Sequence, residues 1–159
     1  MNGKSYTVDE AKKLMERYCL YRERNHQEVT QKLKSLGMIA LARNQILEHL
    51  MQEGYLNETR FAESYARGKF LINKWGRNKI RLALKQKNIS DYNLNKALQE
   101  IDESRYTHQV MQLILKKWTS LDKKTDYETM QKLKAYMLRK GYEYEEINNA
   151  LAQLKENYD

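Results

Sequence analysis

The decapeptide VTQKLKSLGM at residues 29–38 decides the fold, because its pattern occurs three times in the chain. Two apolar residues four positions apart, Val29 and Leu33, predict the buried side of a helix. Gly37 follows where that helix should stop, since glycine readily adopts the left-handed conformation that ends many helices. Met38 then supplies the apolar side chain that packs back on the last turn. The stretch therefore predicts a helix end and the turn after it.

The same pattern returns as IRLALKQKNI at residues 80–89 and as LKAYMLRKGY at residues 133–142, at spacings of 51 and then 53 residues. Asn88 replaces glycine in the second copy, and asparagine is the next residue to tolerate the left-handed conformation. A longer amphipathic helix is expected before each copy, at residues 8–22, 57–73 and 104–119. After each turn comes an apolar stripe of helical period, at Ile46, Leu47 and Leu50; at Ala97, Leu98 and Ile101; and at Ala150, Leu151 and Leu154.

These patterns predict an all-α protein of three tandem three-helix repeats, at residues 1–54, 55–103 and 104–159. The absence of proline and the presence of only six glycines fit a helical chain. A unit of about 50 residues buries little surface alone, so we expect the repeats to pack in a row, in an elongated and curved arrangement. A compact nine-helix globule is the alternative.

Helix-start residues support these boundaries. The candidates are Thr7 or Asp9, Asn57, Ser90 or Asp91, and Thr125 or Asp126. Arg43 stands where the other repeats have Leu94 and Ile147, so the third helix of the first repeat is expected to sit differently. The only cysteine, Cys19, lies among apolar helical positions and is interpreted as a small core residue.

Positive charge is concentrated in the second repeat. The chain carries 29 basic and 21 acidic residues, a formal charge of +8, and residues 64–90 contain no Asp or Glu. Arg77, Arg81 and Lys85 recur every four residues and should form one stripe beside the apolar face. Such a stripe suits a phosphate backbone. The candidate binding residues are Arg60, Arg67, Lys69, Lys74, Trp75, Arg77, Lys79, Arg81, Lys85 and Lys87.

A purely structural interpretation is the alternative for each of these features. Charge runs are commonly solvated helix faces, and tryptophans commonly pack in cores. We favour binding for the basic stripe, because an acid-free run of this length is unusual in a chain otherwise rich in Glu and Asp. For Trp75 we favour packing in the core or between helices over an exposed stacking role. An acidic protein surface would also suit the stripe.

Sequence motifs of catalysis are missing. There is no phosphate loop, no G-x-S-x-G and no Cys-His pairing for nucleophilic chemistry. The histidines His26, His49 and His108 lie in different repeats and lack metal-ligand spacing. We expect no enzyme activity, cofactor, metal or small-molecule substrate. The sequence also has no signal peptide, membrane span or long heptad seam, so a cytoplasmic monomer without membrane contact is expected.

The second repeat resembles the RecX family of recombination regulators. The residues that carry the resemblance are the segment Gln52-Glu53-Gly54-Tyr55-Leu56-Asn57-Glu58-Thr59-Arg60-Phe61-Ala62, then Tyr65, Arg67, Trp75-Gly76, Ile80, Leu84, Lys87 and Ile89. The family pattern reads like E-G-Y-L-x-D-x-R-F-A, then an aromatic residue, an Arg, a W-G turn, I-x-x-x-L and K-G-I. Asn57, Asn88 and Arg43 depart from it, which affects local geometry. The triple arrangement extends the resemblance to residues 8–157.

This resemblance implies a protein that binds the RecA filament on DNA, here expected to be single-stranded. It also implies lowered RecA activities, including ATP hydrolysis, strand exchange and promotion of repressor cleavage in DNA repair and the SOS response. Two other classes stay open: a sequence-specific regulator with a helix-turn-helix, and a basic helical DNA-binding or scaffold protein unrelated to RecA. Three equivalent turns count against the regulator, because it needs only one recognition helix.

Overall fold

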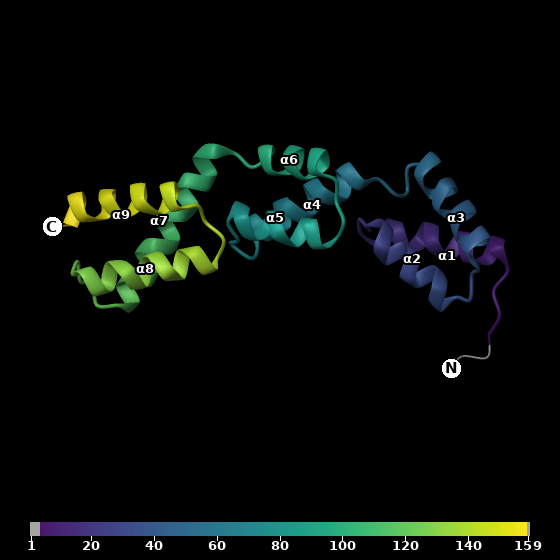
Figure 1. The fold of residues 1–159 in the computed structure, drawn as a ribbon, viewed down its shortest axis with the longest axis horizontal. Coiled ribbons are helices and arrows are strands. Elements are labelled where there is room, and N and C mark those ends of the chain that lie inside the picture. The colour runs from purple at the N-terminus through teal and green to yellow at the C-terminus, as the bar shows by residue number, and fades with distance from the viewer. Residues whose placement is uncertain (1–3, 159) are drawn as a thin grey trace. The chain divides into compact units, whose positions relative to one another are not determined.

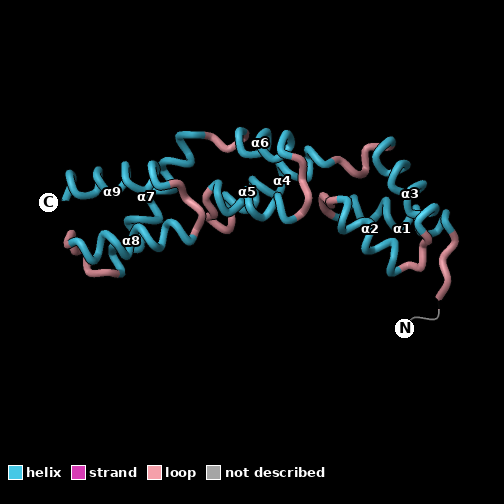
Figure 2. Tube along the Cα trace, viewed as in Figure 1, coloured by secondary structure: helices cyan, strands magenta, loops and turns pink. Residues whose placement is uncertain are grey.

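A computed structural model describes residues 4–158, and every regular element in that span is a helix (Figures 1 and 2). The all-α class predicted from the sequence is confirmed. The helices in chain order are α1 (Val8–Tyr21), α2 (His26–Ser35), α3 (Ala40–Gln52), α4 (Glu58–Leu71), α5 (Arg77–Gln86), α6 (Asp91–Gln99), α7 (Glu103–Ser120), α8 (Tyr127–Arg139) and α9 (Tyr144–Tyr158).

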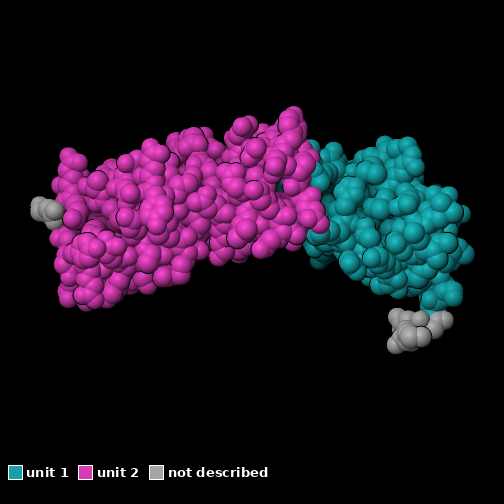
Figure 3. Space-filling model, viewed as in Figure 1, with its two compact units in different colours: residues 1–64 teal, residues 65–159 magenta. Residues whose placement is uncertain are grey.

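The chain forms two compact units, one ending at Ser64 and the other beginning at Tyr65 (Figure 3). This division falls inside α4, whereas the helices follow one another in three groups of three, as the repeated decapeptides predict. The repeat boundaries expected at residues 54/55 and 103/104 stay a prediction.

The three predicted turns share one backbone geometry. Gly37, Asn88 and Gly141 all have positive φ, at 78°, 60° and 95°. In each turn the amide of the next residue donates to the carbonyl five residues earlier: Met38 to Leu33 at 3.0 Å, Ile89 to Leu84 at 3.2 Å, and Tyr142 to Met137 at 3.2 Å. This bond pattern satisfies helix-end carbonyls and brings the apolar residue back onto the helix. The chemistry inferred from the three decapeptides is confirmed.

Predicted residues cap the starts of four of the described helices, α1, α4, α6 and α8. Thr7 accepts a hydrogen bond from the Glu10 amide at 3.1 Å and completes a capping box. The Asn57 side chain accepts from the Arg60 amide at 2.9 Å. For α6 and α8 the sequence offered two capping candidates each. Ser90 caps α6, and Asp126 caps α8.

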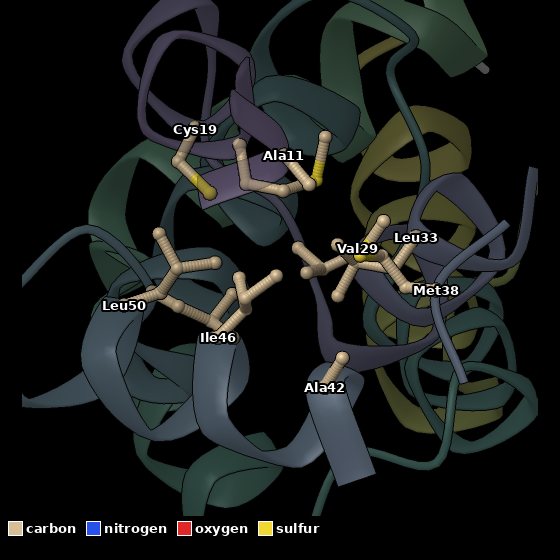
Figure 4. Close-up of a cluster of buried hydrophobic side chains, with 10 residues drawn as sticks. Ala11, Cys19, Val29, Leu33, Met38, Ala42, Ile46 and Leu50 are labelled. Atoms are coloured by element: carbon tan, nitrogen blue, oxygen red, sulfur yellow. The ribbon is translucent and has the colours of Figure 1, made fainter. Parts of the chain in front are cut away.

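The first unit has a core built from α1, α2 and α3 (Figure 4). Val29 and Leu33, from the deciding decapeptide, are fully buried, and Cys19 is buried with them as predicted. Burial raises the pKa of the Cys19 thiol, which disfavours the reactive thiolate. Arg43 stays half-buried, and its guanidinium donates to the Met38 carbonyl at 2.9 Å. Its polar head therefore binds the turn instead of entering the core.

In the second unit, the N-terminus of α5 meets the C-terminal turn of α8 through backbone hydrogen bonds. The Gly76 amide donates to the Lys140 carbonyl at 2.8 Å, and the Asn78 amide donates to the Gly141 carbonyl at 2.9 Å. A Cβ on Gly76 would lie 2.4 Å from the Gly141 carbonyl carbon. A Cβ on Gly141 would lie 2.3 Å from Cβ of Lys79. We call this contact the α5–α8 joint; both glycines are required by close approach.

An ion-pair network surrounds the joint. The Arg77 guanidinium donates to Glu143 at 2.8 Å and to Glu103 at 2.5 Å, and it lies 3.8 Å from the centre of the Tyr106 ring. The Arg77 amide donates to the Tyr106 hydroxyl at 3.0 Å, and that hydroxyl donates to Glu143. Burial disfavours the charged guanidinium, but the two carboxylates outweigh it and hold the pKa of Arg77 above its ordinary value.

A second buried contact lies beside this network. The Gln109 side chain donates to the Phe70 carbonyl at 3.0 Å and to the Tyr142 hydroxyl at 2.8 Å. That hydroxyl donates onward to the Lys74 carbonyl at 2.9 Å. Burial raises the pKa of Tyr142 to about 12, so the hydroxyl stays a neutral donor. These bonds tie the loop before α5 to α7 and to the turn after α8.

Replacing Gly76 with alanine should destabilise the protein, because the new methyl group meets backbone that has no room to move. We expect a loss of about 3 kcal/mol in the free energy of unfolding, the upper part of the usual range for overpacking. Urea denaturation followed by circular dichroism measures it.

The control for this variant is Gly68→Ala, in the last turn of α4, where a Cβ meets nothing within 4 Å. Its free energy of unfolding should equal that of the wild type or exceed it by up to about 1 kcal/mol, because alanine stabilises a helix more than glycine does. Equal effects of the two substitutions would refute the role given to Gly76.

Arg77→Gln should also destabilise the protein, because it leaves Glu143 and Glu103 without their cation. Hydrogen bonds to charged groups contribute on the order of 2 kcal/mol, and a loss of that size is expected in urea denaturation. Arg81→Gln, on the same helix, is the matched control. Its only described hydrogen bond joins Arg81 Nη1 to the Asn95 side chain at 3.4 Å, so its effect should stay within about 0.5 kcal/mol. A stable Arg77→Gln protein would contradict the structural assignment.

Candidate nucleic-acid interface

Three lysines and two aromatic rings gather on one surface of the second unit. Lys69 Nζ lies 5.4 Å from the Tyr65 ring centre and 4.8 Å from that of Trp75. Lys79 Nζ lies 4.6 Å from the Trp75 ring, and Lys87 Nζ lies 5.4 Å from the Tyr65 ring. We call these five residues the lysine–aromatic surface. They alternate cations with flat apolar rings.

Local structure fixes each member of this surface. Tyr65 and Lys69 are four residues apart on α4, so they share a helix face. The Trp75 amide donates to the Lys69 carbonyl at 3.0 Å, which holds the loop against the end of α4. Lys79 is on the first turns of α5, where its backbone packs against Gly141 at the α5–α8 joint. Lys87 is the residue that ends α5.

The cations of this surface are not neutralised by acids. Among residues 4–158, no carboxylate oxygen lies within 4.0 Å of the Nζ atoms of Lys69, Lys79 and Lys87. Tyr65 is half-buried, and burial raises the pKa of its hydroxyl. Trp75 is half-buried too, so it belongs neither to the core nor to open solvent. Uncompensated cations beside aromatic rings are the groups that bind single strands through phosphates and stacked bases.

The predicted stripe of Arg77, Arg81 and Lys85 does not act as one row of free cations. Arg77 is bound to two carboxylates, and its side chain is only 14% exposed. Arg81 is half-buried and near Asn95, whereas Lys85 is exposed. The sequence could not reveal the pairing of Arg77, because its partners Glu103 and Glu143 are far along the chain and outside the acid-free run.

The remaining predicted residues have separate surroundings. Arg60 belongs to the first unit, where its guanidinium binds Glu23 at 2.8 Å and the Gly54 carbonyl at 2.8 Å. Arg67 is exposed on α4. Lys74 has a left-handed backbone, with φ of 60°, and lines a groove of about 570 Å³ with Leu71, Arg105 and other residues of α7. These three residues are therefore not members of the lysine–aromatic surface.

Tyr65 is the member of the surface that sequence reasoning did not select as a binding residue. It entered only as a marker of the family resemblance. The spacing of Tyr65 and Lys69 at i and i+4 on a predicted helix is the signal that connects them.

Residues 4–158 contain neither a cluster of metal-binding side chains nor a helix that could span a membrane. No group of three metal-binding side chains occurs in the described part of the chain. His49, one of the three histidines, binds Glu16 with an Nε2–Oε2 distance of 2.9 Å. Between residues 4 and 158, no helix has the length and apolar character needed to cross a membrane.

Two family models match successive segments of the chain. Residues 57–98 match the one described as "RecX, second three-helix domain", and residues 106–151 match "RecX, third three-helix domain". The two matches together cover more than half of the chain. All five residues of the lysine–aromatic surface lie within the first of them.

Curated relatives and solved structures agree with these matches. The chain is 28% identical over 142 residues to "Regulatory protein RecX" of Bacillus cytotoxicus, covering 89% of this chain and 53% of the relative. It is 31% identical over 136 residues to that of Clostridium perfringens, covering 84% and 63%. The chain therefore spans about half to under two thirds of these relatives' length.

The crystal structure of RecX from Lactobacillus salivarius shares the fold. Its TM-score is 0.85, with 24% sequence identity and coverage of 93% of this chain and 96% of that chain. The fold, the two matched domains and the curated relatives lead to one conclusion: the chain belongs to the RecX family of regulatory proteins.

Proposed function

We propose that this protein binds the RecA filament on DNA and lowers RecA activities, including ATP hydrolysis, strand exchange and promotion of repressor cleavage. It acts by binding, without a catalytic step, in the cytoplasm and as a monomer. The observation that carries the proposal is the lysine–aromatic surface, which lies inside the matched second RecX domain.

The side chains of this surface can bind phosphates and unpaired bases. Lys69, Lys79 and Lys87 have no carboxylate partner in the part of the chain that is described, so they remain available to phosphates. Each phosphate contact releases counterions, which makes binding favourable at low salt and weak at high salt. Half-buried Trp75 and Tyr65 offer rings for stacking, which requires bases that are not already paired in a duplex. The surface therefore favours single-stranded DNA, the strand on which a RecA filament assembles.

The test is the rate of ATP hydrolysis by RecA from the same organism on single-stranded DNA, titrated with this protein. The wild-type protein should inhibit. The variant Lys69→Gln/Lys79→Gln/Lys87→Gln should need at least roughly tenfold more protein for equal inhibition, and its binding should depend less on salt, because three lysines no longer bind phosphates.

The matched control is Lys13→Gln/Lys32→Gln/Lys34→Gln, which removes the same charge from exposed positions of α1 and α2. It should inhibit like the wild type. Equal inhibition by both triple variants would remove the lysine–aromatic surface from the proposal. If the wild-type protein neither inhibits RecA nor binds the filament, the RecA function is wrong. A partner kept after nuclease treatment and in high salt would then favour a helical scaffold.

A further inference from the structure

A second aromatic ring with two lysines lies near the α5–α8 joint. Tyr136, on α8, has Lys117 Nζ at 5.1 Å and Lys140 Nζ at 5.8 Å from its ring centre. We call these three residues the Tyr136 cluster. Its composition matches that of Trp75, which has Lys69 and Lys79 at 4.8 and 4.6 Å. The third repeat therefore carries the same chemistry as the second.

The joint brings the two clusters next to each other. Lys140 ends α8, and its carbonyl accepts the Gly76 amide at 2.8 Å, one residue after Trp75. Lys79 packs its Cβ against Gly141, the residue after Lys140. Backbone contacts therefore hold the backbones of Lys79 and Lys140 next to each other. Such preorganisation lowers the entropy that a ligand must lose when it contacts both.

The electrostatics of the joint favour an anion. Among described residues, no carboxylate oxygen lies within 4.0 Å of the Nζ atoms of Lys117, Lys140 or Lys79. Burial, followed by repulsion from Lys79 and Lys116, lowers the pKa of Lys140. Like charges that converge without acids raise the free energy of the unbound protein. A bound anion would relieve that repulsion.

We propose that the Tyr136 cluster is a second binding site for single-stranded nucleic acid, continuous with the lysine–aromatic surface across the α5–α8 joint. Lys79, Lys117 and Lys140 contact successive phosphates of one strand, and Trp75 and Tyr136 each stack on a base. The inference rests on the proposed function only in assuming that this protein meets single-stranded DNA. It adds the path of the strand, which runs from the second repeat onto the third.

The experiment measures binding of the full chain to a fluorescein-labelled oligothymidylate, by anisotropy, over a series of salt concentrations. Lys117→Gln/Lys140→Gln should flatten the log–log salt dependence by about 0.7 for each phosphate that the variant no longer binds. Lys96→Gln/Lys155→Gln is the control, with the same loss of charge at exposed positions of α6 and α9. The control should keep the wild-type slope.

Stacking is tested separately at Tyr136. Tyr136→Ala should weaken oligothymidylate binding roughly tenfold, whereas Tyr136→Trp should retain it, because any large aromatic ring stacks on a base. The tryptophan variant keeps the test decisive if the alanine variant is poorly folded. Loss of binding in both variants, with folding intact by circular dichroism, would overturn the stacking role.

Three further outcomes separate this inference from the proposed function. If the double variant and its control bind DNA with equal slopes, the Tyr136 cluster is not a phosphate site, although RecA inhibition can stand. If inorganic phosphate at millimolar concentration competes fully with the oligothymidylate, the cluster is a site for a free anion and the inference fails. If DNA binding behaves as expected but RecA is not inhibited, the inference holds and the proposed function fails.

Discussion

The α5–α8 joint is the constraint on which the second unit depends. Two helix ends meet there through backbone hydrogen bonds, with backbone amides of one end donating to backbone carbonyls of the other. At the start of α5, the amides of Gly76 and Asn78 have no partner within the helix. They donate to the carbonyls of Lys140 and Gly141, which end α8. Unpaired backbone groups are costly when buried, so this exchange stabilises both helix ends at once. It is possible only because Gly76 and Gly141 lack Cβ atoms.

Two kinds of cation lie on α5 at the joint. Arg77 lies on the inner side, where Glu103 and Glu143 neutralise it and Tyr106 covers it. Lys79, only two residues further along α5, has no acid partner within 4.0 Å in residues 4–158 and lies over Trp75. One helix turn thus carries a cation that holds the fold and a cation left for a ligand. The candidate binding residues predicted from the sequence included both cations without distinguishing their roles.

Local chemistry was predictable, and the fold follows from it. The positive φ of Gly37, Asn88 and Gly141 was expected from residue type and spacing alone, because a helix end is decided within a few residues. Caps at Thr7, Asn57, Ser90 and Asp126 were predictable for the same reason. Contacts between residues that are distant in sequence were not predictable. Neither the pairing of Arg77 with Glu143 nor the approach of Lys140 to Lys79 leaves a periodic signal, because both arise where α8 meets α5. The surroundings of half-buried Trp75 likewise left no signal, because Lys69 and Lys79, which lie near its ring, come from two different helices.

The α5–α8 joint should make α5, α7 and α8 one cooperative body that carries the cationic surface. Hydrogen exchange at the Gly76 and Asn78 amides is the measurement that decides this. Both amides should exchange as slowly as the core amide of Leu84, with the same dependence on urea, because they open only when the whole unit unfolds. Exchange of Gly76 and Asn78 at nearly the unprotected rate, while Leu84 stays protected, would contradict it and separate the two clusters of lysines and aromatic rings.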